Sequence, residues 1–184
     1  KSKLEAAKDC RFKLIFTDSV FSMDGDLAKL PDICDLADQF DAAVGIDDCH
    51  ATGHLWRTGR GAAEELGVLD RIDIITGTLG KTLGGGAGGF TVASAEIVDW
   101  LRNRSRPYLF SNSVPPALAA AGMKALELVD QAGEFRDRLR ANTRKLRTGL
   151  ETAGFTIKPG PTPILPVMLG DAALATRMAD ELLK

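Results

Sequence analysis

The sequence lacks a large excess of charge of either sign. Its 184 residues carry 23 lysines and arginines against 25 aspartates and glutamates, giving a formal net charge of −2. A balance this close excludes a global attraction to nucleic acid or to an acidic membrane surface. The chain also lacks a hydrophobic run long enough to span a membrane, and no signal peptide is visible. We expect a cytoplasmic protein, although the missing signal peptide proves little because the chain looks cut from something longer.

Cysteine is scarce, and neither internal repeats nor low-complexity segments are present. Cys10, Cys34 and Cys49 are odd in number and show no C-x-x-C spacing. Such a set is typical of free thiols in a reducing compartment and argues against a disulfide framework. The chain opens directly in helix-like sequence, KSKLEAAKDC, without a start signal. We therefore expect it to be part of a longer polypeptide.

Apolar runs alternate with helix-like segments over the first two thirds of the chain. Short strands are predicted at 12–17, 42–47, 72–75 and 90–94, and helices at 32–40, 62–66 and 96–104. This alternation predicts an α/β fold with a largely parallel sheet. Ligands of such sheets bind beyond the carboxyl ends of the strands. Polar clusters around Ser22, 47–50 and 78–81 each follow an apolar run, so we expect them to converge on one site.

The last third of the chain is predicted to be mostly helical. Pro115-Pro116 opens one helix, and a longer one follows with an apolar stripe. That stripe consists of Phe135, Leu139, Leu146 and Leu150. Its other faces carry Arg136, Arg138, Arg140, Arg144, Lys145 and Arg147. A basic helix can bind phosphates or nucleic acid, but the near-neutral chain favours a solvated face.

After Gly154 the chain becomes proline-rich with strand-like ends, and Asp171 is predicted to cap a last helix. We place the domain boundary at the start of the long helix. Residues 1–133 would belong to a large domain. Residues 134–184 would form an interdomain helix and the start of a smaller domain.

One lysine stands in the most glycine-rich stretch, DIITGTLGKTLGGGAGGF at 73–90. Lys81 is surrounded by Gly77, Gly80, Gly84, Gly85, Gly86, Gly88 and Gly89. Glycines at this density weaken helices and strands, because each loses much backbone entropy on folding. Such a loop indicates close approach of the main chain to a ligand, or positive φ angles. The alternative is a flexible surface turn with a solvated lysine.

Several motifs of other enzyme and binding classes are present only in part, or stand in the wrong structural context. Gly84, Gly86 and Gly89 fit G-x-G-x-x-G, but a loop precedes them and a strand follows, which argues against a dinucleotide fold. GTLGKT at 77–82 resembles the end of a nucleotide phosphate loop, but the first glycine of that pattern would fall on Ile75. This argues against a nucleoside-triphosphate site. His50 and His54 have helical metal-ligand spacing, but glycine and threonine lie between them and no glutamate follows His50. No G-x-S-x-G motif of a serine hydrolase is present.

A pyridoxal-phosphate site fits these residues better. This cofactor needs a lysine for its Schiff base, a carboxylate at its pyridine nitrogen and donors for its phosphate. Lys81 would supply the amine and Asp47 the carboxylate. His50 could donate to the phenolic oxygen of the ring, and Thr78 offers a hydroxyl to the phosphate. Singly, each residue has a structural explanation, such as a helix cap for Asp47; together and in this order they favour the cofactor.

The motifs TDSVFSMDGD, DDCHATG, DIITGTLGKTLGG and RSRPYLFSNSVPP resemble those of the α-oxoamine synthase family of pyridoxal-phosphate enzymes. The resemblance covers nearly all 184 residues. It implies a type I aminotransferase-like large domain, with a mostly parallel sheet flanked by helices, plus the beginning of a small C-terminal α+β domain. It also implies a homodimer with a shared active site.

The family's functional residues transfer by position. The resemblance implies that Lys81 is the Schiff-base lysine, Asp47 the partner of the pyridine nitrogen and His50 the neighbour of the phenolic oxygen. Two further cofactor contacts, a serine and a phosphate ligand, would be Ser22 and Thr78. Ser111 and Asn112 of FSNS would reach the phosphate of the neighbouring subunit's cofactor.

The implied reaction condenses glycine with acetyl-CoA to 2-amino-3-oxobutanoate and CoA, and runs in reverse in threonine degradation. RSRPYLFSNS and the glycines after Lys81 favour this member over synthases of 8-amino-7-oxononanoate or 5-aminolevulinate. A non-catalytic paralogous subunit is the other alternative, against which the intact Lys81, Asp47 and His50 argue. In a eukaryote, the mitochondrial matrix is the expected location.

Two features depart from the family. His54 and Trp56 stand where relatives tend to have an aromatic residue and a glycine, and the tryptophan either narrows the approach to the site or, as we favour, packs on the surface. The family's N-terminal histidine that stacks on the cofactor and its C-terminal substrate-binding arginine are not in the chain. We therefore expect residues 1–184 alone to be inactive.

Overall fold

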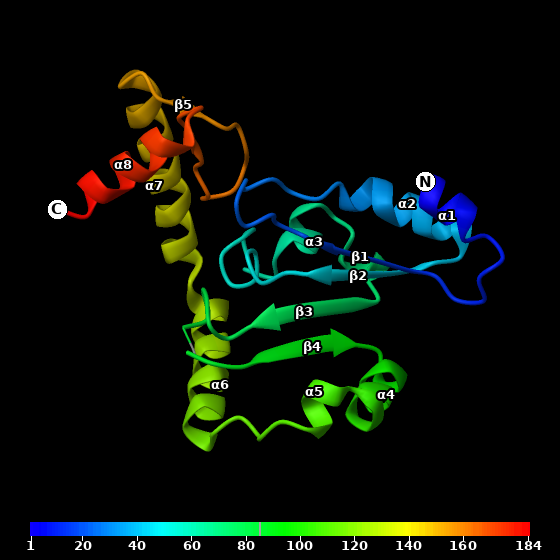
Figure 1. The fold of residues 1–184 in the computed structure, drawn as a ribbon. Coiled ribbons are helices and arrows are strands. Elements are labelled where there is room, and N and C mark those ends of the chain that lie inside the picture. Colours follow the sequence, from blue (N-terminus) through cyan, green and yellow to red (C-terminus); the bar gives the residue numbers. More distant parts are fainter. Residues whose placement is uncertain (85) are drawn as a thin grey trace.

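The computed structural model describes residues 1–84 and 86–184, and its centre is a four-stranded sheet (Figure 1). The strands are β1 (Leu14–Asp18), β2 (Ala43–Asp47), β3 (Ile74–Thr78) and β4 (Gly89–Ala93), in that spatial order. β1, β2 and β3 are parallel, and β4 is antiparallel to β3. The predicted α/β architecture with a largely parallel sheet is confirmed.

Short helices precede β1 and connect the parallel strands, and they cover one side of the sheet (Figure 1). They are α1 (Ser2–Ala6), α2 (Leu30–Phe40), α3 (Ala62–Glu65) and the 3₁₀ turn η1 (Leu69–Arg71). α2 has a proline in its first turn, as the sequence predicts, and buries Leu30, Cys34 and Ala37. These side chains pack in one core with Val44 and Ile46 of β2, the most deeply buried strand.

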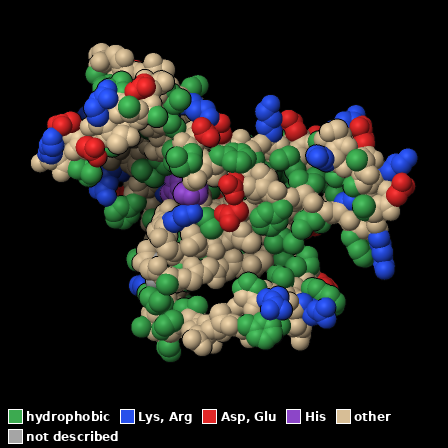
Figure 2. All heavy atoms as spheres, in the orientation of Figure 1, with side chains coloured by type: hydrophobic (Ala, Val, Ile, Leu, Met, Phe, Trp, Pro, Cys, Tyr) green, Lys and Arg blue, Asp and Glu red, His purple; other side chains and the backbone are tan. Residues whose placement is uncertain are grey.

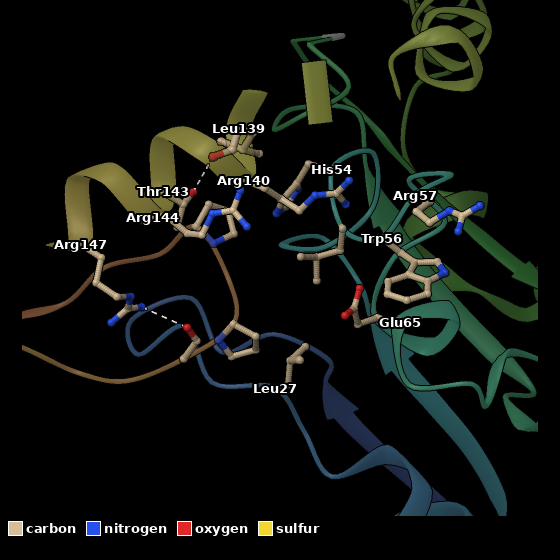
Figure 3. Close-up of a pocket in the computed structure, with 14 residues that line it drawn as sticks. Leu27, His54, Trp56, Arg57, Glu65, Leu139, Arg140, Thr143, Arg144 and Arg147 are labelled. Atoms are coloured by element: carbon tan, nitrogen blue, oxygen red, sulfur yellow. Dashed lines mark hydrogen bonds between the residues drawn. The ribbon is translucent and has the colours of Figure 1, made fainter. Parts of the chain in front are cut away.

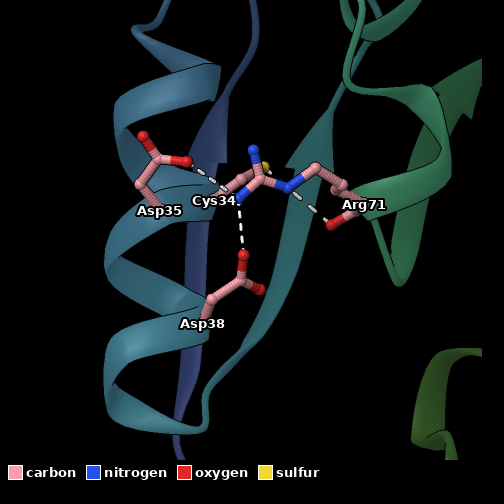
Figure 4. Close-up of polar contacts among 4 residues, drawn as sticks. All are labelled: Cys34, Asp35, Asp38 and Arg71. Carbon is pink, nitrogen blue, oxygen red and sulfur yellow. Dashed lines mark hydrogen bonds and ion pairs between the residues drawn. The ribbon is translucent and has the colours of Figure 1, made fainter.

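Arg71 ties η1 to α2 (Figure 4). Its Nη2 lies 2.9 Å from Asp35 Oδ1 and 2.6 Å from Asp38 Oδ2, while its carbonyl accepts a long hydrogen bond from Cys34 Sγ. The charged groups are exposed, so they contribute little to stability. They hold the entry of β3 against α2. Burial raises the pKa of the Cys34 thiol, and all three cysteines are free thiols, as expected.

The remaining helices follow β4. They are α4 (Ala95–Arg104), α5 (Arg106–Leu109), α6 (Pro116–Gln131), α7 (Gly133–Thr152) and α8 (Ala172–Leu182). β5 (Thr156–Ile157) and β6 (Val167–Met168) pair as a small antiparallel sheet. The predicted cap of α8 is confirmed, because Asp171 Oδ1 accepts a 2.6 Å hydrogen bond from the amide of Leu174. The column of α6 and α7 faces the carboxyl ends of β1–β3 (Figure 1).

Polar contacts join the C-terminal elements to the loop after β1. Lys158 Nζ lies 2.9 Å from Asp24 Oδ1 and 2.7 Å from Asp26 Oδ2. The buried hydroxyl of Thr162 donates a 2.8 Å hydrogen bond to the carbonyl of Gly25. Residues 160–163, called the 160s segment below, are thereby fixed beside the loop after β1. This segment borders the space next to the carboxyl edge of the sheet.

The burial of side chains along the long helix α7 differs in part from the prediction. Two members of the apolar stripe, Phe135 and Leu146, are 65% and 56% exposed. The prediction of a solvated basic face is wrong for Arg136, which is buried. Its Nε donates to the carbonyl of Arg57 at 2.9 Å and its Nη1 to that of Val129 at 2.6 Å. A guanidinium can be buried where backbone carbonyls accept its hydrogens.

The glycines at the two ends of the lysine loop belong to strands. The prediction that the third strand ends at residue 75 is wrong, because β3 continues to Thr78. Gly77 lies in β3 opposite Phe90, and Gly89 begins β4. Gly85 lies outside the described residues. No helix in the described part of the chain is long and apolar enough to cross a membrane.

A side chain at Gly77 is expected to destabilise the sheet. A Cβ there would overlap the ring of Phe90, which lies across the glycine. We expect Gly77→Ala to lower the free energy of unfolding by about 1–3 kcal/mol, as overpacking does. Urea unfolding would measure it. Gly149→Ala is the matched control, because a Cβ there meets nothing; equal losses in both variants would contradict the packing argument.

Candidate active site

The loops after β1, β2 and β3 start side by side at the carboxyl edge of the sheet. Asp18, Asp47 and Thr76 are neighbours in the strand register. Beyond them, the amide of Ser19 donates to the carbonyl of Asp47, and that of Asp48 to the carbonyl of Thr76, both at 2.8 Å. Hydrogen bonding therefore continues past the strand ends and fixes where the loops begin.

Lys81 and His50 meet at this edge. Lys81 Nζ lies 2.9 Å from His50 Nε2 although the residues are 31 positions apart. Lys81 is exposed and His50 is half-buried. Figure 2 shows the histidine side chains at the surface, beside a basic side chain and close to acidic ones. The sequence-predicted amine and imidazole are thus brought together.

Asp47 is the last residue of β2 and lies near this pair. Its Oδ1 accepts a 2.9 Å hydrogen bond from the amide of Cys49. Burial opposes its negative charge, but hydrogen bonds from Cys49 and Thr76 and the charge of Lys81 outweigh burial and lower the pKa of the Asp47 carboxyl below its ordinary value. Asp47 is consequently a carboxylate at neutral pH, as a partner for a protonated ring nitrogen must be.

Cys49 lies between Asp47 and His50 but is not a nucleophile. Burial and the neighbouring Asp47 raise the pKa of its thiol to about 11. A thiol in that state carries almost no thiolate at neutral pH, and the thiolate is the reactive form. Cys49 is therefore a poor candidate for a reactive nucleophile at this edge.

Thr78 and Ser22 lie at the same edge with different environments. Thr78 Oγ1 donates to the carbonyl of Gly88 at 3.3 Å and accepts from the amide of Gly80 at 3.1 Å, so it shapes the turn that leads to Lys81. Ser22 is exposed in the turn after β1. Within the described residues, no hydrogen bond joins either hydroxyl to Lys81 or His50.

Ser111 and Asn112 are exposed in the segment between α5 and α6. The hydroxyl of Ser111 donates to the carbonyl of Pro107. In the part of the chain that the structure describes, neither side chain is hydrogen-bonded to the Lys81–His50 pair. Their expected role concerns a neighbouring subunit, and it stays a prediction.

Asp48 is the residue that sequence reasoning missed. It is buried, and its carboxylate accepts hydrogen bonds from Ser19 Oγ at 2.6 Å, Thr52 Oγ1 at 2.6 Å and the amide of Ala62 at 3.2 Å. Burial is the main reason that the pKa of Asp48 is raised. It joins the loops after β1 and β2 to the start of α3. The only signal in the sequence was its place one residue after a buried strand.

His54 connects the loop after β2 to the lysine loop. Its Nδ1 lies 3.2 Å from Thr82 Oγ1, next to Lys81 in the chain. Burial, and then the proximity of His50, lower the pKa of His54.

The described residues contain no cluster of three or more His, Cys, Asp or Glu side chains that could hold a metal ion.

A pocket of about 490 Å³ opens on the other side of His54 (Figure 3). Its walls come from the loop after β2, from α7 and from the 160s segment. Trp56 lines it, with 39% of its surface exposed and a φ of 59°, a left-handed conformation that is uncommon for a bulky residue. The indole of Trp56 thus lies at the surface, where it borders this cavity.

The donor set at the sheet edge fits pyridoxal phosphate. An exposed amine is available at Lys81, and an ionised carboxylate lies close enough to it to be stabilised by its charge. His50 presents a ring nitrogen at the same point. These are the groups that the aldehyde, the pyridine nitrogen and the phenolic oxygen of the cofactor require.

A family model described as aminotransferase class I and II matches residues 1–184. The chain is 53% identical over 186 aligned residues to 2-amino-3-ketobutyrate coenzyme A ligase of Escherichia coli K12, covering 100% of the chain and 47% of the relative. It is 48% identical to 8-amino-7-oxononanoate synthase of Geotalea daltonii, over 93% of the chain and 44% of the relative.

Among solved structures, a serine palmitoyltransferase variant from S. paucimobilis with a bound PLP–myriocin aldimine matches with a TM-score of 0.90. The two are 32% identical, over 96% of this chain and 46% of that one. These likenesses confirm the type I aminotransferase-like fold and the predicted resemblance to α-oxoamine synthases. The chain spans about half the length of the curated relatives it matches, and over all of its 184 residues it belongs to the aminotransferase class I and II family.

Proposed function

We propose that this chain is the cofactor-binding core of a pyridoxal-phosphate-dependent acyltransferase. The reaction condenses glycine with acetyl-CoA to 2-amino-3-oxobutanoate and CoA, and it is reversible. The observation that carries the proposal is the contact of Lys81 with His50 beside the ionised Asp47. Support for this reaction comes from the 53% identity to a 2-amino-3-ketobutyrate coenzyme A ligase.

Lys81, Asp47 and His50 would hold the cofactor, with Ser22 and Thr78 as further contacts. When bound, pyridoxal phosphate supplies an electron-withdrawing ring that stabilises negative charge on the α-carbon of glycine. Asp47 keeps the ring nitrogen protonated, because its own carboxyl remains ionised at neutral pH. The carboxylate thus acts through the ring and touches no substrate atom.

Lys81 is the base that removes the α-proton of glycine. Its Nζ is within hydrogen-bond distance of His50 Nε2, which restricts the amine to one side of the site. The turn held by Thr78 Oγ1 sets the path of the backbone just before the lysine. Orientation of the amine therefore comes from two elements, the loop after β2 and the lysine loop.

The proposal includes a homodimer in which Ser111 and Asn112 reach the phosphate of the neighbouring subunit's cofactor. Both are exposed and therefore available to a second chain. Residues 1–133 would be part of the large cofactor-binding domain, and residues 134–184 the interdomain helix and start of the small domain. The expected location is the cytoplasm, or the mitochondrial matrix in a eukaryote.

A sister α-oxoamine synthase with a longer acyl-CoA substrate is the second candidate function. The 48% identity to an 8-amino-7-oxononanoate synthase favours it over unrelated activities. A non-catalytic subunit is the weaker alternative, since such a subunit has no use for Lys81, Asp47 and His50 in this arrangement.

Thiol release separates these functions. We expect the complete polypeptide that carries this chain, loaded with pyridoxal phosphate and glycine, to release free CoA from acetyl-CoA, measured with a thiol reagent. Release from a longer acyl-CoA alone would move the assignment to the sister synthase. Release from neither, with cofactor still bound, would indicate the non-catalytic subunit.

A further inference from the structure

Three arginines of α7 project into the pocket beside His54. Arg140, Arg144 and Arg147 are spaced by four and three residues, so they share one helix face. All three line the cavity of about 490 Å³ (Figure 3). This volume lies within the range of pockets that hold small molecules. The basic residues of α7 are therefore not simply a solvated face.

The charge of the pocket is strongly positive. Among its described lining residues, Glu65 is the acidic one. Arg147 is anchored to the carbonyls of Lys158 and Gly160 at 2.9 and 3.1 Å, and Arg140 pairs with Asp137. Arg144 has no hydrogen-bond or ion-pair partner within residues 1–84 and 86–184. Among the described lining arginines, Arg57 and Arg144 thus have no side-chain partner, while Arg140 and Arg147 are held in place on the same helix as Arg144.

The same pocket offers apolar surface for a flat ring. Trp56 lines it together with Leu27 and Leu139. A left-handed backbone at Trp56 fixes the direction in which the indole leaves the loop. Guanidinium groups suit phosphates, and an indole beside them suits an aromatic base. Together these groups match a phosphorylated nucleoside.

The pocket adjoins the proposed reaction centre. His54 forms part of its wall and contacts Thr82, the neighbour of Lys81. A ligand anchored by phosphates among the arginines could therefore extend past His54 toward the amine. An acyl-CoA has this form, since its phosphorylated adenosine lies at the opposite end from its thioester.

We propose that this pocket binds the phosphorylated adenosine part of coenzyme A, an inference that rests on the proposed acyltransferase function. Arg144 bonds the phosphates, Arg140 and Arg147 add charge, and Trp56 packs against the adenine. The pocket anchors the substrate far from its reacting carbonyl. Its residues act on acyl-CoA affinity and leave the chemical step unchanged.

Arg144→Gln tests the anion site in the complete, cofactor-loaded polypeptide. We expect KM for acetyl-CoA to rise about tenfold with kcat unchanged, and KM for S-acetylpantetheine, which has no phosphate, to stay as in the wild type. Calorimetry with adenosine 3′,5′-bisphosphate should show a similar loss of affinity. Arg138→Gln is the matched control, because Arg138 lies on α7 over the ring of Phe135 and does not line the pocket.

Trp56→Gly gives an independent test of the adenine contact. Glycine suits a φ of 59°, so the indole is removed without backbone strain. We expect weaker binding of the bisphosphate in this variant too. Unchanged affinity for the bisphosphate in both variants would overturn the pocket assignment while leaving acyl transfer intact. Loss of bisphosphate binding in Arg144→Gln, with no CoA released by the wild type, would uphold the pocket and overturn the acyltransferase function.

Discussion

Replacing Lys81 by alanine is expected to abolish acyl transfer and the covalent attachment of pyridoxal phosphate together. Lys81 carries the exposed amine in contact with His50, beside the ionised Asp47. Because we propose Lys81 as both the covalent anchor and the proton acceptor, its removal should lower kcat by at least about a thousandfold. Borohydride reduction followed by peptide mass analysis would show whether the cofactor is attached at position 81.

Two comparisons isolate the amine from general effects of the substitution. Lys81→Arg keeps the positive charge but should also lose covalent attachment, because a guanidinium does not add to the aldehyde. Lys124→Ala removes an exposed lysine of α6 whose partner is Glu127, and it should retain full activity. If Lys81→Ala still releases CoA at the wild-type rate, Lys81 is not the catalytic amine.

The parts of the fold and site that the sequence predicted are those set by short-range pattern. Apolar runs with polar ends mark β1, β2 and β3, and parallel strands place their following loops at one edge. That rule alone brings Lys81 and His50 to the same region, and the structure puts their nitrogens 2.9 Å apart. The boundary of β3 was wrong because Gly77 and Thr78 pair with β4, a partner that comes later in the chain.

The residues that pattern could not predict depend on partners far along the chain. Arg136 reads as one of many helix arginines, and it is buried only because the carbonyl of Arg57, 79 positions away, accepts its Nε hydrogen. Arg144 resembles its neighbours on α7, yet it faces a pocket completed by the 160s segment. No local periodicity encodes these contacts, since tertiary packing alone brings the groups together.

Asp48 is expected to be the most stability-sensitive polar residue near the site. Asp48→Ala would leave the hydroxyls of Ser19 and Thr52 and the amide of Ala62 without their acceptor in a buried place. We expect a loss of about 3 kcal/mol or more in the free energy of unfolding. Asp48→Asn should cost about 1 kcal/mol or less, because its amide oxygen can still accept and the hydroxyl of Thr52 can rotate to accept from its amide nitrogen.

Comparing the wild type with Asp48→Asn also tests how stability depends on pH. Burial raises the folded-state pKa of Asp48 above the ordinary value of 3.8, so the folded protein holds this proton more tightly than the unfolded chain. The stabilisation is complete below the unfolded pKa and is lost as pH rises through the folded pKa. Asp48→Asn does not titrate there. Urea unfolding between about pH 4 and about pH 8 should therefore show wild type losing stability relative to Asp48→Asn as pH rises. A constant difference would mean that Asp48 is not a destabilised buried carboxylate, and its hydrogen bonds would then fully offset the cost of burying its charge.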